Sequence, residues 1–286
     1  MSQSVNSTVS PSLVQRARRI ASREPGLALG LLILTIILVV ALFPSLFATH
    51  SPFNIDVNAA MQPPSAEHWF GTDDVGRDVY SRIVYGARIT LSICAGSLFL
   101  SALIGGSLGL VSGYFGGLAD QLLGRLIDVL LSFPPIILGV IITGILGPQT
   151  VNLILALSMV YMPVFFRIAR AGAMSETGKT YVEAARSMGI TEATILRKHV
   201  TRNVMPLIFT QYMILFPLIL QIQSALGFLG LGVQPPAPDW GAILEQGKDF
   251  ILFAPWMSVF PGLAVLLASL SLILVGRALQ KRVDQR

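Results

Sequence analysis

The sequence predicts an all-α integral membrane protein with about six transmembrane helices. Of its 286 residues, 53% are hydrophobic and only 12% are charged, and the mean hydropathy is +0.70. Soluble domains carry about 25% charged residues, so this chain has too few charges to cover a surface that faces water. The stretch from Leu27 to His50 contains no Asp, Glu, Lys or Arg. A helix of about 20 mainly apolar residues crosses a bilayer, which makes this stretch a candidate span.

The first span is predicted at residues 27–48, after a cytoplasmic N-terminal arm at residues 1–26. The arginines of this arm resemble the basic region of a secretory signal. However, the apolar run is longer than the roughly 7–15 residues of such a signal, and no clear cleavage site follows it. We therefore interpret the segment as an uncleaved anchor helix.

The remaining spans form a predicted five-helix core at residues 89–276. Hydrophobic runs place these helices at residues 89–113, 121–146, 151–169, 206–226 and 251–276. The polar segments around and between the spans are 49–88, 170–205 and 227–250, and a basic tail follows at 277–286.

The positive charges are divided unevenly between the two sides that this topology creates. With the N-terminus in the cytoplasm, sixteen of the 20 lysines and arginines lie on the cytoplasmic side. The external side holds only Arg77, Arg82, Arg88 and Lys248. This is the positive-inside pattern of membrane proteins, so we predict cytoplasmic termini. The net charge of +5 then gives no support for nucleic-acid binding.

Glycines recur every four residues in the second span, at Gly105, Gly109, Gly113 and Gly117. On a helix they form a strip without side chains, which lets another helix backbone approach closely. We favour packing within the bundle over a role in conformational change.

The cytoplasmic segment 170–205 carries an apolar stripe on a short predicted helix. Its members recur with the spacing of one helix face: Tyr181, Ala184, Ala185 and Met188. A helix face of small residues fits deeply into a groove of another protein. The alternative interpretation is that this helix lies on the membrane interface.

Residues beside the stripe define the ends of the predicted helix. Glu183 and Arg186 lie off the stripe with the spacing of an i, i+3 ion pair. Gly189 supplies a helix stop. Thr191 is a candidate N-cap for a second cytoplasmic helix.

Three parts of the sequence resemble a known family. Glu183-Ala184-Ala185, followed after three residues by Gly189, resembles the EAA loop of binding-protein-dependent ABC importer permeases. Residues 68–91 and 226–241 resemble the C-type permease of the dipeptide, oligopeptide and nickel importer family, and the similarity extends over about residues 25–278. The chain departs from the family at Arg202, where a proline commonly precedes the asparagine corresponding to Asn203.

The resemblance implies a type I ABC importer permease fold with cytoplasmic coupling helices, in the bacterial cytoplasmic membrane. The implied partners are a second related permease, two ATPase subunits, a periplasmic substrate-binding protein and membrane lipid. ATP and Mg²⁺ are expected in the ATPase subunits, with no cofactor in this chain. The implied activity is import of di- or oligopeptides by alternating access, with nickel or another small solute as the alternative. The residues expected to couple to the ATPases are Tyr181, Glu183, Ala184, Ala185, Met188 and Gly189.

Residues 173–180 match a relaxed phosphate-loop pattern in which Ala173 replaces the first glycine. A phosphate loop binds its ligand where a strand leads into a helix N-terminus. Here a membrane helix precedes the segment, so we expect this chain to bind no ATP and to be no enzyme.

Four charged residues cluster in the external segment: Asp73, Asp74, Arg77 and Asp78. Their carboxylates are a candidate site for a divalent cation. The favoured interpretation is a capped, hydrogen-bonded turn that opens the helix entering the second span. The family resemblance implies that this face meets the periplasmic binding protein.

Polar residues within the spans are candidates for a pathway or gate. Asp128 is expected inside the third span, where a carboxylate is costly without a partner. Arg125 is the nearest candidate partner, and a structural pair is favoured over a gate or proton site. The fifth span adds candidates that do not share one face: Gln211, Gln221, Gln223 and Ser224.

Two other classes of function are alternatives to the importer. An ion-coupled secondary transporter would use Asp128 as its coupling carboxylate and would need no docking helix. An intramembrane hydrolase would need catalytic residues at membrane depth, whereas His50, His68 and His199 lie outside the predicted spans. Cys94 is the only cysteine, which excludes an intrachain disulfide and a thiol-based metal site.

Overall fold

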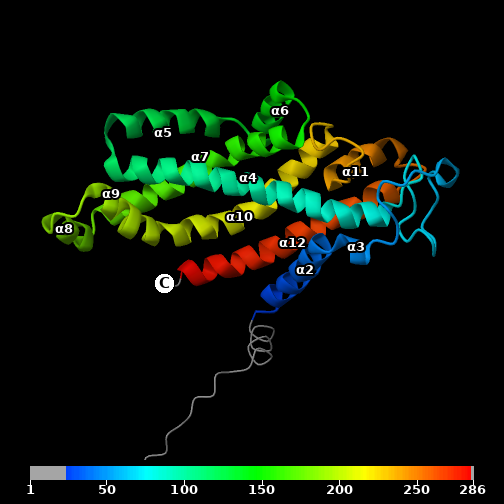
Figure 1. The fold of residues 1–286 in the computed structure, drawn as a ribbon, viewed down its shortest axis with the longest axis horizontal. Helices are drawn as coiled ribbons and strands as arrows, with labels where there is room; N and C mark the ends of the chain where they lie inside the picture. Colours follow the sequence, from blue (N-terminus) through cyan, green and yellow to red (C-terminus); the bar gives the residue numbers. More distant parts are fainter. Residues whose placement is uncertain (1–23, 285–286) are drawn as a thin grey trace, which may run out of the picture.

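The computed structural model describes residues 24–284, which fold into a bundle of long helices (Figure 1). Five helices in this range are long and apolar enough to cross a membrane, and a bent helix pair makes a sixth candidate span. The prediction of an all-α membrane protein with about six spans is confirmed. The long helices are α2 (Pro25–Leu42), α4 (Val79–Phe115), α7 (Thr150–Thr177), α10 (Thr201–Phe228) and α12 (Trp256–Asp284).

The third predicted span, at 121–146, is wrong as a single helix. It consists of α5 (Gly117–Ser132) and α6 (Pro135–Leu146), which meet at 97°. Phe133 and Pro134 between them are extended, with ψ of 137° and 133°. A residue before proline is pushed out of the helical region, and proline itself has no N–H to continue the helix. The consecutive prolines at 134 and 135 therefore account for the bend.

The helices extend beyond the apolar runs that predict them. Helix α4 begins at Val79, inside the predicted external segment, and α7 continues to Thr177. Helix α10 is continuous from Glu192, through α9 (Glu192–Ile195) and a π-helical turn, η2 (Leu196–Val200). Hydropathy marks only the apolar part of a helix, whereas capping residues mark its ends. The second predicted cytoplasmic helix and the fifth span are therefore one helix.

The bundle has two distinct ends (Figure 1). One, the loop end, is formed by residues 49–78 together with α11 (Trp240–Gly247) and the start of α12. The other, the α8 end, carries α8 (Thr180–Ser187), where α4 and α7 finish and the α9–α10 helix begins. The remaining short elements are α3 (Pro44–Phe47), η1 (Val57–Ala59), α11 (Trp240–Gly247) and η3 (Lys248–Phe250).

The glycine strip brings the backbones of α4 and α7 into contact. A Cβ added at any of three strip positions would lie 2.3 Å from a carbonyl oxygen of α7: at Gly105 from Met162, at Gly109 from Phe166 and at Gly113 from Arg170. This is far too close for a real Cβ, so only glycine permits the approach. The packing role predicted for these three is confirmed. Gly117 differs, because it lies beyond α4 with φ of +77° and has no such neighbour.

Two serines extend the strip toward the loop end with the same four-residue spacing. Ser101 Oγ donates to the carbonyl oxygen of Ser158 on α7 at 2.9 Å, and Ser158 Oγ donates to that of Ser97 at 3.1 Å. All three serines are buried. Small residues and interhelical hydrogen bonds are what hold membrane helices together, because burying apolar surface from lipid gains little. Helices α4 and α7 therefore form the most closely packed pair of the bundle.

Arg88 joins the first span to this pair. Its Nε donates to the carbonyl oxygen of Ala41 at 2.9 Å, and its Nη2 donates to that of Leu42. These carbonyls belong to the last turn of α2, where no intrahelical N–H is available to them. A cation from α4 thus caps the C-terminus of α2, with a favourable charge for that helix end.

Asp239 ties α11 to α4 and α10. Its buried carboxylate is the N-cap of α11 and accepts hydrogen bonds from Thr90 Oγ1 at 2.6 Å and Gln223 Nε2 at 2.8 Å. Burial raises the pKa of the Asp239 carboxyl, and these hydrogen bonds oppose the rise. Gln223, considered as a pathway residue, therefore joins helices inside the chain.

The glycine strip predicts the effect of adding single methyl groups along α4. Gly109→Ala should lower the midpoint of thermal unfolding in detergent, because overpacking costs about 1–3 kcal/mol. Gly96→Ala is the matched control on the same helix, since a Cβ at Gly96 meets no atom within 4 Å. It should leave the midpoint unchanged or raise it, because alanine favours the helix. Equal destabilisation by both substitutions would contradict the close-approach account.

Candidate functional site

Helix α8 lies in the segment that connects the end of α7 at Thr177 to the start of α9 at Glu192. Gly178 ends α7, and Lys179, with extended backbone, is the N-cap of α8. In Figure 1 the helix projects from the bundle beyond the ends of its neighbours. It is therefore placed where another protein can reach it.

The two faces of α8 differ in exposure. Val182 and Ala185 are buried against this chain, whereas Ala184 and Met188 are exposed and Tyr181 is half-buried. The prediction that all four stripe residues face a partner is therefore wrong for Ala185. The buried face of α8 consists of Val182 and Ala185. Val182 is not part of the predicted stripe, so the buried face and the stripe are different sides of the helix that share only Ala185. A large residue at Ala185 would disturb the fold of this chain itself.

Gly189 stops α8 as predicted. Its φ is +74°, its N–H donates to the carbonyl oxygen of Arg186, and the N–H of Ile190 donates to that of Ala185. These two bonds form a Schellman motif, which satisfies the last carbonyls of a helix. A Cβ at Gly189 would meet no atom within 4 Å. Backbone conformation, and not space within the chain, therefore requires glycine here.

Glu176, at the end of α7, joins three helices in what we call the Glu176 cluster: Glu176, Lys179, Tyr181 and Asn203. Its carboxylate accepts hydrogen bonds from Tyr181 Oη at 2.6 Å, Asn203 Nδ2 at 2.9 Å and Lys179 Nζ. Burial and the bond to Glu176 raise the pKa of the Tyr181 hydroxyl, which keeps it a donor. Helices α7, α8 and α10 thus share one carboxylate.

Glu192, at the start of α9, forms a second group, the Glu192 cluster: Glu192, Arg186 and Tyr114. Arg186 donates from Nε and Nη2 to the two carboxylate oxygens at 2.9 and 3.3 Å, and Tyr114 Oη donates to the same carboxylate. The predicted pair of Arg186 with Glu183 is wrong, because Glu192 offers both oxygens to the guanidinium. Thr191 precedes α9 as its N-cap, but its hydroxyl accepts no backbone N–H and instead donates to Thr194 Oγ1.

At the loop end, the turn predicted from the charged cluster is confirmed. Asp78 is the N-cap of α4, and its carboxylate accepts the N–H of Ser81 at 2.8 Å. Asp73 accepts the N–H of Arg77 at 2.9 Å, and its carboxylate pairs with the guanidinium groups of Arg77 and the fully buried Arg82. A contact of Asp73, Asp74, Arg77 or Asp78 with an external protein stays a prediction.

Asp128 lies on the surface of this chain and pairs with a different residue from the predicted one. Its side chain is 60% exposed and accepts a hydrogen bond from Arg167 Nη2 at 2.6 Å, not from Arg125. Helix α5 packs against α7, which brings Arg167 within reach of Asp128. Asp120 pairs with Arg170 of α7 in the same way, at 2.5 Å.

The polar residues of the fifth span differ in their surroundings. Ser224 is buried beside Gln223, whereas Gln221 is exposed and Gln211 is half-buried. A surface that lines a pathway between two subunits must be exposed on each isolated subunit, which favours Gln211 and Gln221 over Ser224. Their role in a pathway stays a prediction.

Comparison with known proteins identifies the family. Residues 105–286 match the family described as binding-protein-dependent transport system inner membrane component, and residues 12–64 match the N-terminal transmembrane domain of oligopeptide transport permease C. The chain belongs to this family of transport permeases. The resemblance noted in the sequence is thereby confirmed.

Several curated relatives cover most of this permease. It is 37% identical to the dipeptide transport system permease protein DppC of Alkalihalophilus pseudofirmus, over 90% of this chain and 84% of that protein. It is 36% identical to the probable D,D-dipeptide transport system permease protein DdpC of Escherichia coli, over 89% and 85% of the two chains. The glutathione transport system permease protein GsiD of Pectobacterium atrosepticum is 34% identical, over 94% and 89%.

The segment that matches a relaxed phosphate loop has another structure in this permease. Residues 173–177 complete α7, and Lys179 Nζ donates to Glu176. Arg202, where the family commonly has proline, lies in the continuous helix that starts at Glu192. The sequence does not predict Glu176 and Tyr114 as members of these clusters, because their only signal is a position at a helix end.

The Glu176 cluster predicts a local effect on α8. In the Glu176→Ala permease, hydrogen exchange of residues 178–190 should quicken, because unpaired donors cost about 1–3 kcal/mol. The matched control is Glu183→Ala, which removes an exposed carboxylate for which the described residues provide no hydrogen bond. Hydrogen-exchange mass spectrometry checks both variants. Unchanged protection in Glu176→Ala would show that the cluster does not hold α8.

Proposed function

We propose that this permease imports di- or oligopeptides across the bacterial cytoplasmic membrane by alternating access, driven by ATPase subunits that dock on α8. It pairs with a second, related permease, with the pathway between the two, and a periplasmic binding protein delivers the peptide. ATP and Mg²⁺ bind to the ATPase subunits. This chain performs no covalent chemistry.

The observation that carries the proposal is the outward face of α8. Ala184 and Met188 are apolar yet exposed, and Met188 is 72% exposed. Val182 and Ala185 on the opposite face are buried against the rest of the chain, which fixes the orientation of the outward face. A small residue beside a flexible methionine provides a surface that adapts to a groove of a partner.

The two carboxylate clusters supply a physical route for coupling. A displacement of α8 acts on α7 and α10 through Glu176, and on the end of α4 through Arg186, Glu192 and Tyr114. Charge-assisted hydrogen bonds of this kind are about twice as strong as neutral ones. Motion of a docked ATPase would therefore reach three spanning helices directly.

The distribution of charge supports a cytoplasmic position for α8. Basic residues with exposed side chains gather around it: Lys179, Arg186, Arg197, Lys198 and Arg202. At the loop end, Arg77 and Arg82 are instead buried and paired with Asp73. The basic N-terminal arm, residues 1–23, lies outside the described residues. By the positive-inside rule, this distribution favours a cytoplasmic location for α8 and for the C-terminus.

The names of the relatives favour peptides as the substrate class. Dipeptides, D,D-dipeptides and glutathione all carry amide bonds with free amino and carboxylate groups. Nickel shares none of these groups. A permease pathway for such substrates needs exposed polar side chains, for which Gln211 and Gln221 remain the candidates.

The arrangement of Asp128 argues against an ion-coupled secondary transporter. A coupling carboxylate has to gain and lose its ion during the cycle, whereas Asp128 is exposed and paired with Arg167 at 2.6 Å. The guanidinium already supplies the positive charge that a coupling ion would bring. The pair instead links α5 to α7.

The docking surface predicts uncoupled transport in variants of Gly189. With the assembled transporter in proteoliposomes, Gly189→Glu should lower peptide uptake roughly tenfold, within the usual 1–3 kcal/mol of allosteric coupling. ATP hydrolysis should continue, because the nucleotide sites lie in other subunits. A glutamate disfavours positive φ and adds a charge to the docking face.

The control for this experiment is Gly189→Asn, because asparagine tolerates a positive φ and carries no charge. Uptake by this variant should stay close to that of the unchanged transporter. Met188→Glu tests the same face without altering the turn, and it should behave like Gly189→Glu. Normal uptake by both glutamate variants, with the ATPases still copurifying, would remove α8 as the docking helix.

A further inference from the structure

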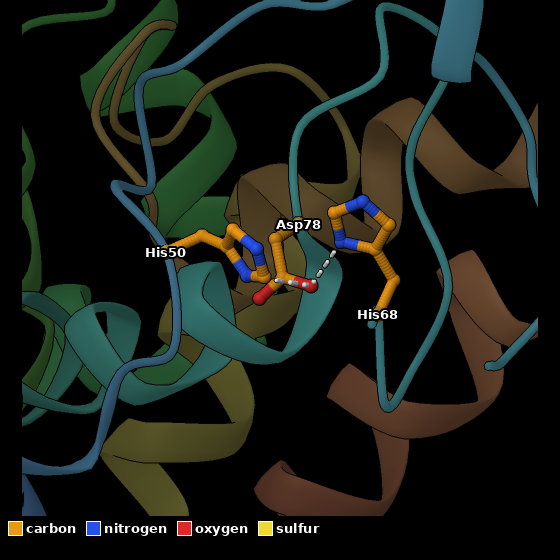
Figure 2. A group of neighbouring side chains, drawn as sticks. All are labelled: His50, His68 and Asp78. Atoms are coloured by element: carbon orange, nitrogen blue, oxygen red, sulfur yellow. Dashed lines mark hydrogen bonds and ion pairs between the residues drawn. The ribbon is translucent and has the colours of Figure 1, made fainter. Parts of the chain in front are cut away.

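Two histidines and an aspartate converge at the loop end, far along the chain from α8 (Figure 2). His68 Nδ1 lies 2.9 Å from Asp78 Oδ1, and His50 Nδ1 lies 4.0 Å from the same oxygen. One candidate ligand atom from each of the three residues lies within 4.8 Å of the others. The three come from the segment after α3, from the following loop and from the N-cap of α4.

The position of His50 is not explained by hydrogen bonding to Asp78. Its ring centroid lies 4.7 Å from that of His68, yet its Nδ1 contacts Thr49 Oγ1 at 3.1 Å and stays 4.0 Å from the carboxylate. His68 alone is enough to form a hydrogen-bonded His–Asp pair with Asp78, so His50 is an additional imidazole. His50 Nδ1 approaches the same oxygen to 4.0 Å, the outer limit of an ion pair, so a third candidate ligand lies beside the His68–Asp78 pair.

The backbone around the three residues is fixed by other contacts. The N–H of His50 donates to Ser81 Oγ, and the N–H of His68 donates to Ser65 Oγ, both at 3.0 Å. Gly76, with φ of +81°, lets the carbonyl of Asp56 approach so closely that a Cβ would lie 1.8 Å from its oxygen. The side chains are thus brought together by a preorganised loop.

A cavity of about 120 Å³ adjoins the cluster. Besides the three candidate ligands, its lining includes Asn54, Asp56 and Glu67. The lining therefore adds two carboxylates and an amide to the buried carboxylate of Asp78. These negative charges offset the positive end of the α4 dipole, which alone would disfavour a cation.

We propose that His50, His68 and Asp78 bind one divalent transition-metal ion of the Zn²⁺ class at the outer face of the permease. Two imidazoles and a carboxylate, with water in the fourth position, are a ligand set typical of zinc. Calcium and magnesium bind oxygen ligands instead. Ligand atoms around a tetrahedral ion with bonds of about 2.0–2.2 Å lie about 3.3–3.6 Å apart. Binding therefore requires His50 to approach Asp78 from 4.0 Å by less than about 1 Å and the His68–Asp78 contact to widen slightly from 2.9 Å.

The ion would clamp the loop end onto the first turn of α4. His50 and His68 flank a segment of the chain that has only one short helical turn, η1, within it. An ion bound by both histidines and by Asp78 would cross-link this segment to the spanning helix α4. The site is separate from α8, so the inference does not depend on the proposed function.

The test uses the full-length permease, purified in mild detergent through a tag without histidine and stripped with a chelator. Titration with Zn²⁺ against a chromophoric competitor should give one ion per chain. His50→Gln and His68→Gln should each weaken binding at least about tenfold, as even outer-shell changes at metal sites do. Substitution of Co²⁺ should produce the visible absorption bands of a nitrogen- and oxygen-ligated ion.

The matched control is His199→Gln, which removes the third histidine of the chain, located at the other end of the bundle. It should bind Zn²⁺ like the unchanged permease. Asp78→Asn keeps an N-cap for α4 but loses the carboxylate, and it should also bind weakly. Size-exclusion profiles check that each variant is folded. If the other variants aggregate, Zn²⁺ binding by His50→Gln alone tests the proposal. Equal Zn²⁺ binding by His50→Gln and the unchanged chain would overturn the proposal, as would binding of less than one ion by the unchanged chain.

Discussion

The contact between the backbones of α4 and α7 is the constraint on which the rest of the structure depends. Glycine at 105, 109 and 113 allows carbonyl oxygens of α7 to lie where a Cβ would otherwise be, and buried serines continue the contact with hydrogen bonds. Lipid offers no hydrophobic force to join helices, so close packing and hydrogen bonds must supply the stability. Four other helices are attached to this pair: α2 through Arg88, α11 and α10 through Asp239, and α5 through two arginine–aspartate pairs.

The position of α8 follows from the same pair of helices. The Glu176 cluster forms at the end of α7, and Tyr114 of the Glu192 cluster lies at the end of α4. Because α4 and α7 are held together along much of their length, the two clusters cannot move far apart. Helix α8 therefore rests on a support fixed by backbone packing, and a force applied to its outward face acts on the pair as a unit. If residues 178–191 were flexible, they would change conformation under such a force, and α4 and α7 would not move.

Sequence reasoning recovered features that depend on local physics. Apolar runs predicted the spans, Gly189 predicted the end of α8, and the charged cluster at residues 73–78 predicted a capped turn, because each depends on a few neighbouring residues. It failed where tertiary geometry decides: Arg186 pairs with Glu192 and not with Glu183, Asp128 pairs with Arg167, and Ala185 faces inward. The bend at residues 133–135 carried a readable signal in its two prolines. The clustering of His50 with His68 and Asp78 had none, since residues 18 and 28 positions apart meet only through the loop fold.

The central claim is that α4 and α7 move as one body, and a distance measurement tests it most directly. Spin labels at Leu103 of α4 and Met174 of α7, both exposed, would be introduced into a Cys94→Ala background of the assembled transporter. Pulsed electron paramagnetic resonance should give the same distance distribution without nucleotide and with a trapped ATP analogue. A shift of more than about 2 Å, the size of helix displacements in conformational switching, would contradict the claim.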